Sequence, residues 1–288
     1  MKSLMLRKKR LVALMSLGIT LLTSSCTNLT PLQEWSKTSL EALQLNELVA
    51  TYSDTPHRLE RYDPSQSQFY AEQTAERTIQ AEALKKILAV VSDYLGTLTT
   101  LSADGTVDYT QQTEGLKSEI SNLNSKLPEG KQISKNTLGA VGSIVKTVLG
   151  AATQAYQAKQ VSHVIEQANA PIQQILKGEL REIVDTDFRR DLKIESIQIN
   201  GYYSHLGEEG HPSKAAQEAV SEWKEMRLEQ NSARMKAVTA YLKVLDNIST
   251  GHQKLFDNRH KLDDKQLIKD LNALVIELRK QINILAKS

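Results

Sequence analysis

The sequence predicts an all-α protein, built as an elongated antiparallel bundle of about six helices. The first observation is composition, because the chain is rich in Leu, Ala, Gln, Glu and Lys and holds only 13 Gly, 6 Pro and 5% aromatic residues. The second is that apolar residues recur at intervals of three and four over several long stretches. Helices of 30 or more residues are about 45–55 Å long, and short connections make neighbours antiparallel.

The first helix is expected to begin at Thr30-Pro31, an N-cap and N1 pair, and to end near Tyr52. Residues 53–67 contain two prolines and little periodicity, which predicts a loop. A long helix is then expected over residues 66–101, where ten apolar positions follow the helical repeat.

Glycines and caps mark the next boundaries. Gly105 is expected to end the long helix in the left-handed conformation. Asp108 with Gln111 matches a capping box and predicts a helix that reaches Leu127. Residues 128–130 then end that helix.

The middle of the chain is predicted to be helical with interruptions. Ser134 is expected to cap a helix over residues 135–168, and Pro171 is expected to break or kink the chain that follows. The isoleucines within residues 193–199 indicate that this piece could end as a strand. Asn200-Gly201 and residues 207–212 predict a turn.

Two final helices are predicted over residues 213–249 and 263–286. Apolar positions of the first include Trp223 and Met226. The second alternates steps of four and three, as coiled-coil seams do. Two aspartates could cap its start: Asp263 and Asp264.

The N-terminus has the pattern of a secretory signal peptide. Residues 1–10 carry five positive charges and no acid, residues 11–22 carry no charge, and small residues precede Cys26. The apolar run is too short to span a bilayer, which takes about 20 residues.

Residues 21–26, LLTSSC, resemble the lipobox of bacterial lipoproteins, although Thr23 stands where Leu is usual. The resemblance implies that residues 1–25 are removed and that Cys26 becomes the acylated first residue. It divides the chain into a signal peptide (1–25), a lipidated tether (26–30) and a single helical-bundle domain (31–288). Thr27, where Asp would favour the inner membrane, implies an outer-membrane anchor facing the periplasm in a diderm cell. The alternative is an ordinary signal peptide with an incidental Cys.

Charge and cysteine content exclude some classes of function. Removal of residues 1–25 leaves 31 basic against 34 acidic residues, a net charge of −3, so nothing in the overall charge favours binding to nucleic acid. Cys26 is the only cysteine, so a lipidated chain has no disulfide and no thiolate for catalysis or metal binding.

No catalytic, cofactor or metal motif is present, so no such residue is assigned. The densest polar cluster joins His205, Glu208, Glu209 and His211, and we interpret it as a solvated turn rather than a zinc site. Acidic pairs are interpreted as caps, solvated faces or a helix–helix turn: Asp104 with Asp108, Asp185 with Asp187, and Asp263 with Asp264. Tyr202-Tyr203 could form a contact patch or pack on the helix ends.

Residues 138–156 are unusual because Lys146 is their only charge and they are rich in Gly and Ala. Gly139, Gly142 and Gly150 would let another helix approach closely. The segment resembles the apolar mid-chain part of long-helix pore-forming proteins. Its other interpretation is the most buried helix of the bundle.

The sequence therefore favours a membrane-anchored bacterial lipoprotein with a non-catalytic helical body that acts as a scaffold or interaction module in the cell envelope. Its expected partners are the membrane, through the lipid on Cys26, and an envelope protein, but no nucleic acid. The alternative is a membrane-active, pore-forming-like protein that uses residues 138–156. A third hypothesis is an envelope enzyme, for which no site can be named.

Overall fold

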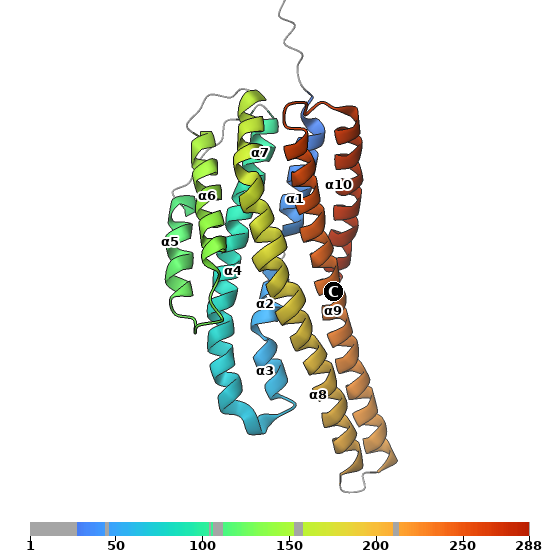
Figure 1. Ribbon diagram of the computed structural model, residues 1–288. Coiled ribbons are helices and arrows are strands. Elements are labelled where there is room, and N and C mark those ends of the chain that lie inside the picture. The colour runs from blue at the N-terminus through green and yellow to red at the C-terminus, as the bar shows by residue number, and fades with distance from the viewer. Residues whose placement is uncertain are drawn as a thin grey trace, which may run out of the picture.

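A computed structural model describes residues 28–43, 46–103, 105, 112–152, 158–209 and 213–287. Within these residues all regular secondary structure is helical, which confirms the all-α prediction. The molecule is elongated, as expected, with its helices running along the long axis (Figure 1). The differences from the prediction concern where helices begin, end and continue.

The N-terminal part holds more helix than expected. Helix α1 spans Thr30–Leu43, α2 spans Asn46–Ser53 and α3 spans Thr55–Glu60, followed by the short 3₁₀ turn η1 (Pro64–Gln66). The loop predicted over residues 53–67 is therefore wrong over most of its length, where the chain is helical. Its prolines lie in the first turns of α3 and η1, where a fixed φ and a missing N–H are tolerated. Helix α1 begins at Thr30, one residue before the predicted first helical residue Pro31. Asn28 Oδ1 accepts from the Thr30 N–H at 3.1 Å and so caps this earlier start.

Helix α4 (Ser67–Ser102) confirms the long helix. The Gly105 N–H donates to the Thr100 carbonyl at 2.9 Å, but Gly105 is not left-handed, so the expected cap is wrong. Among the described glycines the left-handed one is Gly130 (φ 85°), in the turn after α5 (Gln112–Asn124). The expected capping box at Asp108 and Gln111 lies outside the described residues.

Helix α6 spans Lys135–Ala152, and Ser134 caps it as predicted, since its Oγ accepts from the Thr137 N–H at 3.1 Å. The expected helix over residues 135–168 corresponds to α6 and the start of α7 (Ala158–Gln173). Residues 153–157 between them lie outside the described part.

A continuous rod follows from Ala158 to Glu208. It comprises α7, the wide π-helical segments η2 (Gln174–Glu179) and η3 (Glu182–Phe188), and α8 (Arg189–Glu208). Pro171 does not break it. The missing N–H is accommodated within α7, and the wider turns begin three residues later.

The strand-like end at residues 193–199 and the turn at Asn200-Gly201 are both wrong, since α8 runs through them. Tertiary packing explains the helix, because Leu192, Glu195 and Ile199 are buried at helical spacing. The Asn200 side chain donates to the Ser196 carbonyl one turn back, at 2.9 Å, and so supports the helix instead of a turn.

Of the last two helices, α10 is close to its predicted bounds, whereas α9 extends to Asp257 instead of ending at residue 249. Helix α9 spans Lys214–Asp257 and begins at Ser213, whose hydroxyl accepts from the Ala216 N–H at 3.3 Å. Helix α10 spans Lys265–Leu285. Asp264 caps α10, because its Oδ1 accepts from the Gln266 and Leu267 N–H groups at 2.8 and 3.1 Å.

The helices form one bundle with a projecting arm (Figure 1). Helix α4 packs against α1, α5 and α6, and α9 packs against α7, α8 and α10. The start of α1 lies at one end of the molecule, beside the connection from α9 to α10. The end of α8 and the start of α9 form a hairpin whose tip lies at the opposite end, beyond the end of α10.

Helices α1 and α9 approach each other closely at Gly251. Trp35 of α1 is fully buried, and its indole lies over Gly251 of α9. A Cβ built on Gly251 would lie 2.3 Å from Trp35 Nε1, so only glycine fits there.

Candidate functional site

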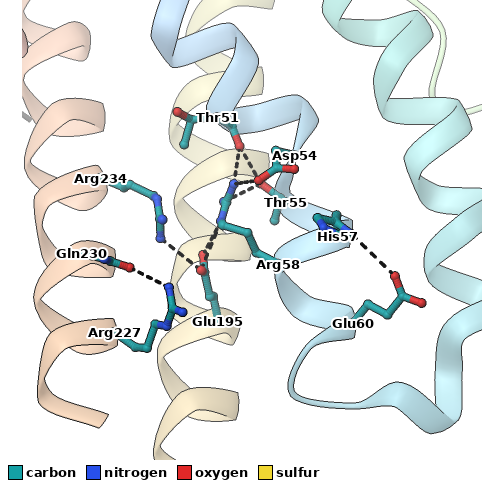
Figure 2. Close-up of polar contacts among 10 residues, drawn as sticks. All are labelled: Thr51, Asp54, Thr55, His57, Arg58, Glu60, Glu195, Arg227, Gln230 and Arg234. Carbon is teal, nitrogen blue, oxygen red and sulfur yellow. Dashed lines mark hydrogen bonds and ion pairs between the residues drawn. The ribbon is translucent and has the colours of Figure 1, made fainter. Parts of the chain in front are cut away.

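The base of the α8–α9 hairpin holds a buried carboxylate between two guanidinium groups (Figure 2). Glu195 of α8 is 1% exposed. Its Oε1 and Oε2 accept from Arg58 Nε at 3.1 and 3.2 Å, and Oε1 also accepts from Arg234 Nη1 at 3.1 Å. These three residues, which we call the ionic clamp, come from α3, α8 and α9.

Arg58 is 5% exposed, and its remaining donors are also used. Nη1 donates to the Thr51 carbonyl at 2.7 Å and lies 3.4 Å from Asp54 Oδ2, while Nη2 donates to Thr55 Oγ1 at 3.0 Å. Thr51 lies at the end of α2, Asp54 between the two helices and Thr55 at the start of α3. A buried charge that is paired and hydrogen-bonded in this way avoids the cost of desolvation without a partner.

A second ion pair lies beside the clamp. Arg77 Nη2 of α4 donates to Asp191 Oδ2 at 2.6 Å, and Arg77 also donates to the Tyr52 hydroxyl and lies 4.3 Å from the centre of that ring. Burial raises the pKa of the Asp191 carboxyl, and the Arg77 charge opposes this shift. Burial likewise raises the pKa of Tyr52.

These contacts join α2, α3 and α4 to the base of the hairpin. Both oxygens of Glu195 accept from guanidinium groups that belong to other helices. The arrangement is therefore suited to holding helices in place. It fixes the direction in which the hairpin leaves the bundle.

Another buried polar chain crosses the core. His252 of α9 is fully buried, with Nε2 2.5 Å from the Tyr94 hydroxyl and Nδ1 2.9 Å from Asn169 Oδ1. Burial lowers the pKa of His252 to about 3, so the ring is neutral and both of its nitrogens have partners. This histidine is a packed core residue.

A cleft of about 470 Å³ lies between α4, the turn before α6 and the π-helical segments. Its acidic side chains are largely engaged. Glu179 Oε2 accepts from Thr137 Oγ1 at 3.0 Å, and Asp187 Oδ1 accepts from Arg190 Nη2 at 3.1 Å.

The predicted site residues are distributed as follows. Cys26 lies outside the described residues, and so does His211. His205, Glu208 and Glu209 are exposed at the hairpin tip. Among the described residues no group of three or more His, Cys, Asp or Glu side chains could hold a metal ion.

The acidic pairs lie where solvated faces and caps were expected. Asp185 lies 3.2 Å from Arg189 Nε, Asp263 is exposed and Asp264 caps α10. The pair at residues 104 and 108 lies outside the described residues.

The two tyrosines next to the tip pack together, with ring centres 5.2 Å apart. Both also contact Tyr62, at 5.8 Å for Tyr202 and 6.3 Å for Tyr203. Tyr202 remains 39% exposed, so this cluster has a packed side and a solvent side.

Residues 138–152 of the apolar segment lie in α6, and residues 153–156 lie outside the described part. Val141, Ile144 and Val148 are buried in the core. The expected close approach at the glycines is wrong: a Cβ at Gly139 or Gly150 would meet nothing within 4 Å, and at Gly142 it would meet only the end of the Lys117 side chain. Within the described residues no helix has both the length and the apolar character needed to cross a bilayer.

The hairpin carries exposed apolar side chains that the sequence did not predict. Seven large apolar side chains are exposed in the part of the chain that the structure describes. Six lie on the start of α4, on α8 or on α9: Phe69, Ile194, Ile197, Tyr202, Trp223 and Met226. The apolar repeat that contains Trp223 and Met226 predicted core positions, but these side chains are 52% and 43% exposed.

No family model, curated protein or solved structure matches this chain. Its function must therefore be inferred from the chain's own sequence, fold and surface. Of these, the ionic clamp and the apolar residues on the hairpin are the most distinctive.

Proposed function

We propose that this protein is a membrane-anchored bacterial lipoprotein whose non-catalytic helical body serves as an interaction module in the cell envelope. The resemblance of residues 21–26 to a lipobox supports the anchor, on Cys26. Only three residues separate Cys26 from Thr30, where α1 begins. A lipid there would hold the end of the body that lies opposite the hairpin tip (Figure 1).

The observation that carries the proposal is that most of the exposed large apolar side chains of the described residues lie on α8, on α9 or on the neighbouring start of α4. Large apolar side chains that gather on one surface mark interaction sites in soluble proteins, whereas scattered single ones do not. Six of the seven in the described residues belong to the hairpin or to the neighbouring start of α4. The remaining one, Ile276, lies on α10.

The ionic clamp supports the same function. It ties α8 and α9 to α3 through buried, hydrogen-bonded charges, so the arm is held in one direction before any partner arrives. Preorganisation of this kind reduces the entropy lost on binding. The body then resembles a rigid spacer with a binding surface at its end.

Two experiments test this function. First, Cys26→Ser should release the protein from membranes washed with carbonate, whereas Ser25→Ala should remain membrane-bound. Second, a photo-crosslinking side chain in place of Trp223 should give discrete crosslinked products in intact cells, and one in place of Ile276 should give none. Membrane retention of Cys26→Ser contradicts the anchor. Equal crosslinking at both positions, or none at either, contradicts the interaction module.

A further inference from the structure

The start of α9 carries a helix face that no other helix covers in the part of the chain that the structure describes. Ala219, Trp223 and Met226, which we call the α9 outer face, follow one another at steps of four and three residues. The seam with α8 uses other positions: the Lys224 ammonium donates to Ser204 Oγ at 3.0 Å, and Asn231 Nδ2 donates to the Leu192 carbonyl at 3.0 Å. The α9 outer face therefore points away from that seam.

The same spacing of three and four residues connects this face with an interface inside the bundle. Steps of three and four residues lead from Met226 along α9 to buried positions, which are Val244, Ile248, Gly251 and Leu255. There α9 packs against α1 and α10, with Trp35 seated on Gly251. Helix α10 ends at Leu285, well above the hairpin tip (Figure 1). Helices α1 and α10 cover this face of α9 in the bundle. A helix is therefore the element that fits the exposed part of the same face, at the start of α9.

Charge defines what kind of helix fits. Glu218, Glu222, Glu225 and Glu229 repeat at steps of four, three and four, and the first three each stand one residue before a member of the α9 outer face. All four are exposed. Glu218 lies 3.8 Å from Lys214, and within the described residues the other three have no ion-pair partner. Like charges at this spacing destabilise a free helix, and basic side chains of a partner would reverse that effect.

We infer that the α9 outer face binds an amphipathic α-helix of another protein, whose apolar seam is flanked by Lys or Arg. This inference rests on the proposed function and names the partner of the same surface. Pairing of this face with itself in a second copy would bring two acidic rows together. An anionic lipid surface would be repelled by the same row.

The test uses the full chain in a non-ionic detergent and two synthetic peptides. Both peptides have about three heptads with Leu at a and d, and they carry either Lys or Glu at e and g. The Lys peptide should shift the emission of Trp223 to shorter wavelength, while Trp35 is already fully buried and contributes a constant signal. The Glu peptide should bind at least tenfold more weakly.

Variants at exposed positions locate the site, with binding measured by anisotropy of labelled peptide. Trp223→Ala should weaken the Lys peptide at least tenfold, and the matched variant Ile276→Ala should leave its affinity unchanged. Glu222→Lys combined with Glu229→Lys should reverse the preference between the two peptides. Circular dichroism should show unchanged helicity in every variant.

Several outcomes would overturn the inference. They are absence of binding by the Lys peptide, equal binding of both peptides, and equal losses for Trp223→Ala and Ile276→Ala. A dimer in sedimentation that Trp223→Ala dissolves would assign the face to a second copy. A shift of Trp223 emission with phosphatidylglycerol vesicles but not with peptide would assign it to lipid. In each case crosslinking at Trp223 in cells still reports separately on the proposed function.

Discussion

Gly251→Ala should destabilise the protein although alanine favours helices. A Cβ at Gly251 would lie 2.3, 2.5 and 2.7 Å from Nε1, Cε2 and Cζ2 of Trp35, whereas ordinary contacts of a Cβ atom are 3.4 Å or longer. Trp35 is fully buried, and a rigid indole in a close-packed core cannot move by more than 1 Å without displacing its neighbours.

The magnitude follows from two opposing effects. Overpacking a core costs about 1–3 kcal/mol, and overlap with a buried ring belongs at or above the upper end of that range. Replacing Gly by Ala within a helix stabilises by about 1 kcal/mol. We therefore expect a net loss of about 2 kcal/mol in the free energy of unfolding. At about 2–4 °C per kcal/mol, Tm should fall by about 4–8 °C.

Urea unfolding followed by circular dichroism measures this change, and Gly96→Ala in α4 is the matched control. A Cβ at Gly96 would meet nothing within 4 Å, so that variant should gain up to about 1 kcal/mol. Trp35→Phe combined with Gly251→Ala should lose less than the sum of the single losses, because phenylalanine lacks the pyrrole edge that collides. If Gly251→Ala proves as stable as Gly96→Ala, the close approach of α1 and α9 is refuted.

Three further outcomes are expected. Glu195→Ala leaves the charges of Arg58 and Arg234 without their shared partner, so denaturant unfolding should show a loss of about 3–5 kcal/mol; a loss below about 1 kcal/mol would contradict the role of the ionic clamp. Burial lowers the pKa of His252 to about 3 in the folded protein, against about 6.5 in the unfolded chain. Its contribution to the free energy of unfolding is therefore complete above about pH 6.5 and is lost towards pH 3, at about 1.4 kcal/mol per pH unit. Between pH 7 and pH 5 the stability of His252→Gln should therefore decline less than that of the unsubstituted chain, and parallel pH profiles would count against a neutral buried ring. Gly142→Ala in α6 should change Tm by no more than about 2 °C, because only a flexible lysine side chain must move, and a large drop would show that a helix does pack there.

Local signals in the sequence were sufficient for the helices whose ends and faces are defined by nearby residues. The apolar repeat over residues 66–101 predicted α4 within one residue at each end, and Ser134 and Asp264 cap their helices as expected. Caps and helical repeats act over a few residues, so a local pattern carries them. The same logic failed at Gly105, where a turn formed without a left-handed glycine.

The candidate site depends on residues that are distant in the chain. Arg58 and Glu195 are 137 residues apart, and Arg234 comes from a third helix. No spacing in the sequence relates them. The glycine that matters for close packing is Gly251, whose partner Trp35 is on α1, whereas the glycine-rich pattern of α6 pointed to Gly142.

The sequence by itself determined the helical class, the elongated shape and those helix boundaries that caps and repeats mark, such as both ends of α4, because these follow from periodicity and caps along one segment. Tertiary structure decided which apolar stripes are covered. Along α9 one apolar repeat contains both Ile248, which is buried, and Trp223, which is exposed. Their burial differs because α1 and α10 reach only the upper part of the helix (Figure 1). Burial is a property of what lies across an interface, so an apolar repeat identifies a contact face without telling whether the contact belongs to the same chain.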